Sequence, residues 1–300
     1  MLVADTHAQN RDLLIIPCWR RPEFLWHCLD NLRRAEGIGD LHVLFRPDRG
    51  HDVRNFEVIE EFGPQLGSYE IDVPPHCPYR RGKQSANVLA AYLRAAALTR
   101  RYVFMVEEDV MVARDFLRWH YAVQAAQPQL FCSIAARNTN RAVPEAADPE
   151  AYYVTTLDYC SLGVCFERSV IVRRIAPHVR REYFEDPGGY CQQHWSASRV
   201  GAAYVEHDGL IRRIQEEQGA RRPIAYPYRP RAFHAGFFGY HRRSALNGAL
   251  PQRIREVGET IYSVEAMHAA ETGPEFSADS VPISLDTPPW KSVRCTARWS

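Results

Sequence analysis

The chain has 300 residues, of which 46% are hydrophobic and 24% are charged, a balance typical of a globular protein that can bury a sizeable core. Its formal net charge of +1 excludes the basic excess expected of a general nucleic-acid binder. The eight cysteines include no Cys-x-x-Cys pair, which argues against a structural zinc site.

Strand and helix patterns alternate from the first apolar segment onward. Residues 12–17, DLLIIP, predict a buried parallel strand. Pro22 suits the first turn of a helix, and apolar residues follow it at helical spacing, namely Phe24, Leu25, Cys28, Leu29 and Leu32. A second strand at 41–45 completes a strand-helix-strand unit, which is the usual opening of a parallel α/β sheet.

The alternation continues after a predicted loop at 74–83. Ser85 is expected to cap a helix, and a strand at 102–106, a helix at 115–126 and a strand at 131–135 follow. This order predicts a doubly wound sheet.

The pattern is looser in the second half of the chain. A strand at 152–156, a short helix at 169–175 and a helix at 208–218 are expected there. Residues 185–201 are rich in Gly, Ser and Gln and are interpreted as an acceptor loop. We expect a single domain over 1–250 with a C-terminal tail, 251–300, packed on it.

The predicted strand at 102–106 runs directly into three carboxylates, Glu107, Glu108 and Asp109. Ligands of open parallel sheets bind beyond the carboxyl ends of the strands, and oxygen ligands there suit Mn²⁺ or Mg²⁺. Such an ion would neutralise charge on a departing diphosphate. The alternative is that the acids only lie at a strand end and at the N-terminus of a following helix, where negative charge is mildly favourable.

Three segments in order, PCWRRPEFLWHCLDNL, RPDRG and VEEDVMVARDFLRWHY, resemble nucleotide-sugar-dependent glycosyltransferases of the GT-A fold. The resemblance is to the N-acetylglucosaminyltransferase I type (glycosyltransferase family 13, family 2-like) and extends with gaps from about residue 12 to about residue 240. It implies a Rossmann-like α/β fold with a doubly wound, mixed and mostly parallel sheet. It also implies a UDP-sugar as donor and Mn²⁺ or Mg²⁺ as cofactor.

The resemblance assigns roles to individual residues. Arg20 and Asp48 match nucleotide contacts, and Asp109 matches the metal ligand. Glu108 would face the ribose or the sugar, although a shorter Asp stands there in the family, and Glu107 completes the acidic triplet. Lys83 and Asn87 lie where related enzymes contact the nucleotide, while a solvated lysine and an ordinary helix asparagine are the alternatives. The family's uracil-side histidine has no counterpart near Ala91.

The implied reaction is inverting and needs one general base. Asp208, at a predicted helix start, is the preferred candidate, and Asp186 in YFEDP is the second. A plain helix N-cap is the alternative for Asp208. His234, in RAFHAGFFGYHR, lies where the resemblance implies a histidine on the diphosphate or the metal. It is preferred to His241 because Ala235 and Gly236 beside it permit close backbone approach, and a structural histidine is the alternative.

We therefore expect a metal-dependent inverting glycosyltransferase, a hexosyl- or N-acetylhexosaminyl-transferase acting on an acceptor hydroxyl. The alternatives are a nucleotidyltransferase that makes a nucleotide-sugar and a non-catalytic sugar-nucleotide-binding module. The first is disfavoured because PCWRRPE lacks a glycine-rich run over a triphosphate. The acceptor could be a glycan, a protein, a metabolite or a modified DNA base. The sequence shows no basic segment followed by an apolar stretch at its start and no run of 18 apolar residues, so we expect a cytoplasmic protein without a transmembrane segment.

Overall fold

The computed structural model describes most of the chain before residue 235. The described ranges are 11–19, 21–48, 51–74, 83–136, 151–156, 159–195, 206–218 and 221–234. Arg20 and the predicted tail at 251–300 lie outside these residues. Among the helices of these ranges, none combines the length and the apolar character that crossing a bilayer requires.

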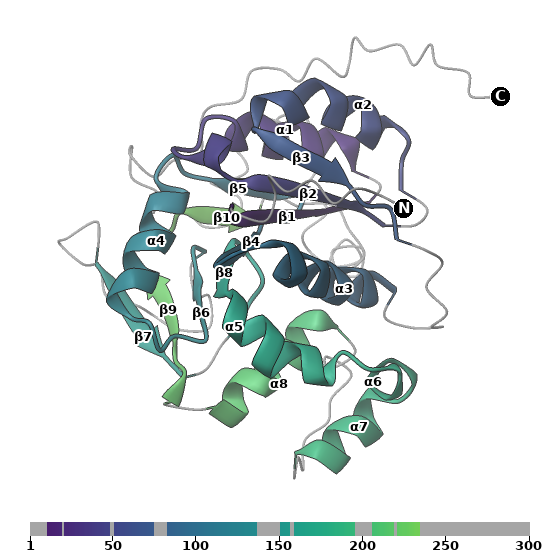
Figure 1. Cartoon of the computed structure of the whole chain (residues 1–300), viewed down its shortest axis with the longest axis vertical. Helices are drawn as coiled ribbons and strands as arrows, with labels where there is room; N and C mark the ends of the chain where they lie inside the picture. The colour runs from purple at the N-terminus through teal and green to yellow at the C-terminus, as the bar shows by residue number, and fades with distance from the viewer. Residues whose placement is uncertain are drawn as a thin grey trace, which may run out of the picture.

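Eight strands form one mixed sheet in the order β3-β2-β1-β4-β8-β6-β9-β7 (Figure 1). Their bounds are β1 Leu13–Cys18, β2 His42–Pro47, β3 Ser68–Ile71, β4 Tyr102–Met105, β6 Cys132–Ile134, β7 Tyr152–Thr155, β8 Val164–Glu167 and β9 Ile224–Pro227. Strands β3, β2, β1, β4, β6 and β9 run in one direction, and β8 and β7 run in the other. The predicted mixed, mostly parallel sheet is confirmed.

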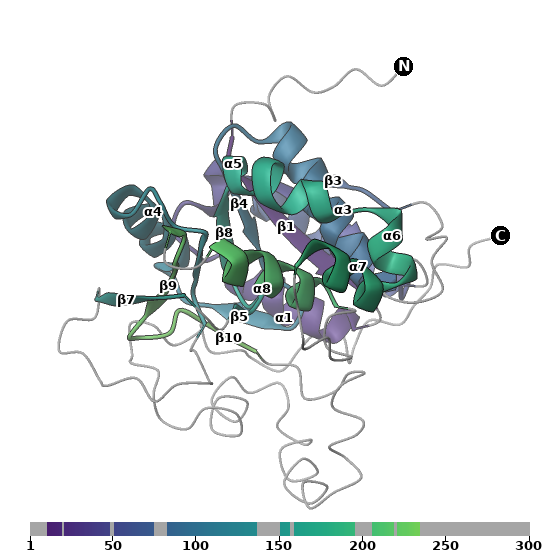
Figure 2. The same ribbon diagram turned by 90° about the horizontal axis from the view of Figure 1, so that it is seen from below.

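Helices cover both faces of this sheet. Their bounds are α1 Pro22–Leu32, α2 Arg54–Phe62, α3 Lys83–Leu98, α4 Phe116–Ala126, α5 Arg168–Val170, α6 Arg181–Glu185, α7 Pro187–His194 and α8 His207–Gln218, with short helical turns η2 Ile38–Asp40, η3 Gly63–Gln65, η4 Ile171–Ile175 and η5 Ala176–His178. Helices α1 and α2 lie on one face, and α3, α5 and α8 lie on the other (Figures 1 and 2). The architecture is three layers, helix on sheet on helix.

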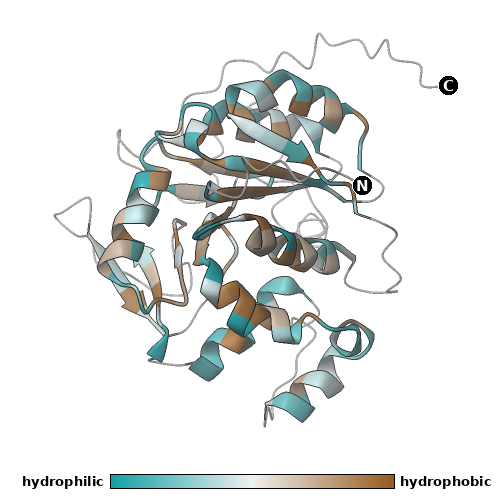
Figure 3. Cartoon of the chain, viewed as in Figure 1, coloured by the Kyte–Doolittle hydropathy of each residue, from teal (hydrophilic) through white to brown (hydrophobic). Residues whose placement is uncertain are grey.

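The centre of the sheet is almost entirely apolar. In β1 the side chains of Leu13, Leu14, Ile15 and Ile16 are fully buried, as expected of a parallel strand with helices on both faces. The strands in the middle of Figure 3 are accordingly coloured toward the hydrophobic end of the scale. The continuous apolar run DLLIIP therefore identified the central strand correctly.

The structure corrects two expectations about local structure. Helix α3 begins at Lys83, so Ser85 lies inside its first turn and does not cap it; the Ser85 hydroxyl instead accepts a hydrogen bond of 2.9 Å from the backbone N–H of His207. The expected acceptor loop 185–201 is helical over Pro187–His194 (α7), because Pro187 suits a first helical turn and the Asp186 side chain caps it.

A second, two-stranded sheet was not expected from the sequence. It pairs β5, Val110–Val112, with β10, Ala232–His234, in antiparallel register, with His234 opposite Val110. This sheet brings the end of the described chain beside the acidic triplet.

Candidate active site

The chain segments that follow β1 and β2 lie side by side at the carboxyl edge of the sheet. The backbone N–H of Asp48 donates to the carbonyl of Cys18 over 2.8 Å, and the N–H of Asp52 donates to the carbonyl of Trp19 over 3.0 Å. Asp48 is half-buried. The residues directly after β1 and the segment with Asp48 are therefore neighbours at the edge where the triplet also lies.

The acidic triplet follows β4, which pairs with the antiparallel strand β8. Met105 of β4 pairs with Val164 of β8, so the residues after Met105 and the residues before Val164 emerge together. Gly163 makes this turn possible, because its φ of +62° is left-handed and a Cβ there would lie 2.8 Å from the Ala232 Cβ.

Arg21 supplies the main charge compensation for the triplet. Its Nε and Nη2 donate to Glu108 Oε1 over 2.9 and 2.7 Å, and its Nη1 donates to Asp109 Oδ2. The Arg21 side chain is 20% exposed, and those of Glu108 and Asp109 only 5% and 3%. Burial raises the pKa of Glu108 to about 7, although the Arg21 charge opposes the rise.

His234 contacts the same carboxylate from β10. Its Nε2 lies 2.9 Å from Asp109 Oδ2. Burial alone would raise the pKa of Asp109, but the charges of His234 and Arg21 outweigh burial and hold that pKa well below its ordinary value. The structure thus brings together Asp109 and His234, which are 125 residues apart in the chain; their roles at a metal or diphosphate stay a prediction.

Glu107, the third carboxylate of the triplet, shares a hydrogen-bond partner with Asp208, the preferred candidate for the general base. The Ser161 hydroxyl lies 2.9 Å from Glu107 Oε1 and 3.2 Å from Asp208 Oδ2. His207 Nε2 lies 3.2 Å from Asp208 Oδ1 and 4.0 Å from Glu107 Oε1. Burial raises the pKa of Glu107, with His207 opposing the rise. Asp208 is therefore part of the same cluster as the triplet.

The residues at the triplet fit a divalent cation bound together with a diphosphate. Asp109 Oδ1 is buried and has no hydrogen-bond partner among the described residues, so it offers an oxygen ligand beside the His234 imidazole. Within the described ranges no group of three or more His, Cys, Asp or Glu side chains is arranged to hold a metal ion. One or two protein ligands suffice for Mg²⁺-type sites that are completed by substrate phosphates and water.

The other candidates lie apart from this cluster or have structural partners. Asn87 Oδ1 accepts a 2.7 Å hydrogen bond from Arg46 Nε, so its amide is held by the core of the domain. Asp186 Oδ1 accepts from the Gly189 backbone N–H over 3.0 Å as the cap of α7. Lys83 is the first residue of α3. Its side chain and the whole of Arg20 are not among the parts of the chain that the structure describes.

Sequence reasoning missed Arg21, Ser161 and His207. Arg21 stands next to the chosen Arg20, and no spacing rule separates two adjacent arginines in a loop. Ser161 precedes β8, a strand that was not predicted, and His207 adjoins Asp208 at the start of α8. The sequence contained no signal for Ser161, because its role depends on the pairing of β8 with β4.

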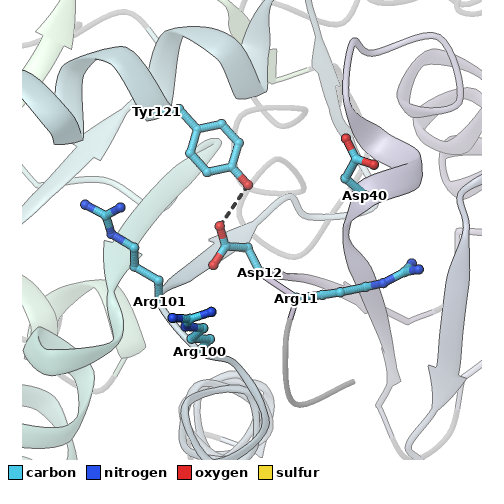
Figure 4. Close-up of a pocket in the computed structure, with 6 residues that line it drawn as sticks. All are labelled: Arg11, Asp12, Asp40, Arg100, Arg101 and Tyr121. Atoms are coloured by element: carbon cyan, nitrogen blue, oxygen red, sulfur yellow. Dashed lines mark hydrogen bonds between the residues drawn. The ribbon is translucent and has the colours of Figure 1, made fainter. Parts of the chain in front are cut away.

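A polar cavity of about 410 Å³ lies at the opposite end of the sheet. It is lined by Arg11, Asp12, Asp40, Arg100, Arg101 and Tyr121 (Figure 4). Asp12 is already used there, since it accepts 2.8 Å and 2.9 Å hydrogen bonds from the Tyr102 N–H and the Tyr121 hydroxyl. This cavity is distinct from the acidic cluster, because it lies where β1 and β4 begin and the triplet lies where β4 ends.

The comparisons with known proteins rest on structure alone. No protein-family model and no curated protein sequence matches the chain. The structure of S. aureus TarS 1–349 in complex with UDP-GlcNAc superimposes with a TM-score of 0.50 at 13% identity, over 87% of this chain and 67% of that one. In another S. aureus TarS structure this chain covers 36% of the matched chain, at 13% identity and a TM-score of 0.47 over 72% of this chain.

Two further structures have lower scores. The mannosyltransferase PcManGT from Pyrobaculum calidifontis, in complex with GDP-Man and Mn²⁺, matches with a TM-score of 0.45 at 17% identity, over 92% of this chain and 67% of that chain. Apo mouse xyloside xylosyltransferase 1 matches with a TM-score of 0.41 at 9% identity, over 69% and 82%. The mixed eight-stranded sheet and the TarS superposition together show that the chain has the GT-A fold of glycosyltransferases.

Proposed function

We propose that the protein is an inverting glycosyltransferase that uses a nucleotide-sugar donor and a divalent cation. The observation that carries the proposal is Asp109, which is buried at the carboxyl edge of a GT-A sheet, contacts Arg21 and His234, and keeps Oδ1 without a partner among the described residues. This edge is where open α/β sheets bind ligands.

Each side chain has a role in this proposal. Asp109 and His234 hold Mn²⁺ or Mg²⁺, which, when bound, neutralises the growing charge of the leaving diphosphate. Arg21 is a guanidinium suited to phosphate oxygens once the donor competes for it. Asp48 and the loop after β1 line the nucleotide side of the edge. UDP is the preferred nucleotide, in keeping with the UDP-GlcNAc bound by TarS.

The proposed reaction is a single displacement. The acceptor oxygen forms a bond to the anomeric carbon while the bond from that carbon to the diphosphate oxygen breaks, and the electron pair leaves with UDP. The hydroxyl proton passes to Asp208, whose side chain is 35% exposed and therefore open to an acceptor. The acceptor remains a hydroxyl of unassigned class.

The test combines binding and turnover. Thermal unfolding is followed with UDP, GDP and UTP, each with and without Mn²⁺, because a ligand of the native state raises the melting temperature. UDP-sugars are then screened for Mn²⁺-dependent release of UDP into water. Stabilisation by UDP with Mn²⁺ together with UDP release supports the proposal. Stabilisation by UTP alone, with formation of a nucleotide-sugar from a sugar phosphate, would replace it by a nucleotidyltransferase.

A further inference from the structure

The Ser161 hydroxyl bridges two carboxylates that come from distant parts of the chain. Its Oγ lies 2.9 Å from Glu107 Oε1, after β4, and 3.2 Å from Asp208 Oδ2, on α8. Ser161 itself is only 3% exposed. A buried hydroxyl costs free energy unless it is hydrogen-bonded, and both partners of this one are carboxylates.

The two oxygens of Asp208 have different surroundings. Oδ2 has the Ser161 hydroxyl. Oδ1 is buried and lacks a hydrogen-bond partner among the described residues, although His207 Nε2 lies 3.2 Å away without the alignment of a hydrogen bond. Oδ1 is shielded from solvent, whereas the Asp208 side chain as a whole is 35% exposed. An acceptor hydroxyl therefore approaches the carboxylate on the side of Oδ2, the oxygen that the Ser161 hydroxyl contacts.

Ser161 is itself fixed from two sides. The β4–β8 register and the left-handed Gly163 set its place at the sheet edge. From the other side, Arg212 Nη2 of α8 donates to the carbonyl of Tyr159 over 3.0 Å. The segment before β8 is thus attached both to the strand that carries the triplet and to the helix that carries Asp208.

We propose that Ser161 is a positioning residue for the general base Asp208. Its hydroxyl holds Oδ2, the accessible oxygen of the carboxylate, at a fixed place relative to the triplet, so that Oδ2 is aligned to receive the acceptor proton. The proposal rests on the proposed function of Asp208. A hydroxyl carries a single hydrogen and can donate to either Glu107 or Asp208, so it links the donor side of the site to the base. Misplacing a catalytic group by about 1 Å costs up to about a hundredfold in rate.

The experiment measures Mn²⁺-dependent hydrolysis of UDP-GlcNAc by the full chain, with Ser161→Ala, Asp208→Asn and the double variant. Ser161→Ala is expected to lower kcat by about tenfold or more, with KM for UDP-GlcNAc and the thermal shift by UDP unchanged. In the Asp208→Asn background, Ser161→Ala is expected to cost nothing further, because residues that act as a unit have non-additive effects.

Ser133→Ala is the matched control. Ser133 is also a fully buried serine at the sheet. Its hydroxyl lies 2.7 Å from His120 Nδ1 and accepts from Gln124 Nε2, and neither of these partners is a carboxylate of the cluster. This variant is expected to lose stability while kcat stays at the wild-type value. A fall in kcat equal to that of Ser161→Ala would reduce the role of Ser161 to general core packing and overturn the proposal.

The remaining outcomes separate the two proposals. Three results would overturn the positioning role and leave Asp208 as base. Two concern Ser161→Ala, namely a wild-type kcat, or a raised KM for UDP-GlcNAc with kcat unchanged. The third is an additive loss of kcat in the double variant. Wild-type turnover in Asp208→Asn overturns the base assignment and, with it, the role of Ser161.

Discussion

Arg21 is the residue whose removal most directly tests the electrostatics of the acidic cluster. In Arg21→Ala, Glu108 and Asp109 stay buried while the guanidinium that contacts both is lost. Removing one partner of a buried ion pair costs about 3–5 kcal/mol. Because Arg21 is one-fifth exposed, we expect the lower end, about 3 kcal/mol at pH 8.

The free energy of unfolding lost in Arg21→Ala should be larger at pH 8 than at pH 5.5. The pKa of Glu108 is raised from its ordinary 4.5 to about 7, first by burial, so its ionisation opposes folding increasingly as pH rises through this interval. Arg21 limits that rise, and without Arg21 the pKa of Glu108 moves higher still. At pH 5.5 Glu108 is largely protonated in both folded proteins, so the variant loses the ion pair with Asp109 and only neutral hydrogen bonds to Glu108. At pH 5.5 we expect the loss in the free energy of unfolding to be about half of the loss at pH 8.

The assay is urea unfolding followed by tryptophan fluorescence at pH 8 and pH 5.5. Arg34→Ala is the matched control, since Arg34 also pairs with a buried aspartate, Asp30, over 2.8 Å, and Asp30 keeps Arg33 as a partner. The control should lose no more than about 1 kcal/mol at either pH. A deficit for Arg21→Ala that is equal at both pH values, or no larger than the control, would refute the reasoning.

Three further variants test the assigned roles. Asp109→Ala should abolish Mn²⁺-dependent UDP release and the Mn²⁺-dependent rise in melting temperature on adding UDP; full UDP release with a chelator present would remove the metal from the proposal. His234→Ala should weaken the apparent Mn²⁺ affinity, measured by thermal titration with UDP, by about tenfold or more, and an unchanged affinity would exclude His234 as a ligand. Asp186→Ala should cost about 1 kcal/mol of stability, because the cap of α7 is lost, and should leave hydrolysis of the UDP-sugar intact; a loss of kcat without a loss of stability would instead make Asp186 the base.

The sequence predicted the half of the fold that is built from local patterns. The apolar run of β1, the Pro22 start of α1 and the periodicity of α4 and α8 are each properties of a few consecutive residues. Strands β3, β5, β8, β9 and β10 were not predicted. Each is only three or four residues long, and an apolar run of that length carries no periodicity that reliably separates a strand from a loop.

The same distinction applies to the site. The placement of Glu107, Glu108 and Asp109 at a strand end follows from the sequence itself, because a strand that runs into carboxylates must present them at the sheet edge. The roles of the three acids do not follow from it. Arg21 reaches Glu108 and Asp109 across the edge, His234 reaches Asp109 through the β5–β10 pairing, and Ser161 reaches Glu107 through the β4–β8 pairing.

The sequence by itself therefore determined that this protein has an α/β sheet with an acidic edge, since an apolar run and the carboxylates that follow it directly are both properties of consecutive residues. The tertiary structure alone decided which cation meets which carboxylate and which hydroxyl holds the candidate base. Those contacts join residues 47 to 125 positions apart in the chain, and their geometry depends on strand register and turn conformation, which no local pattern encodes.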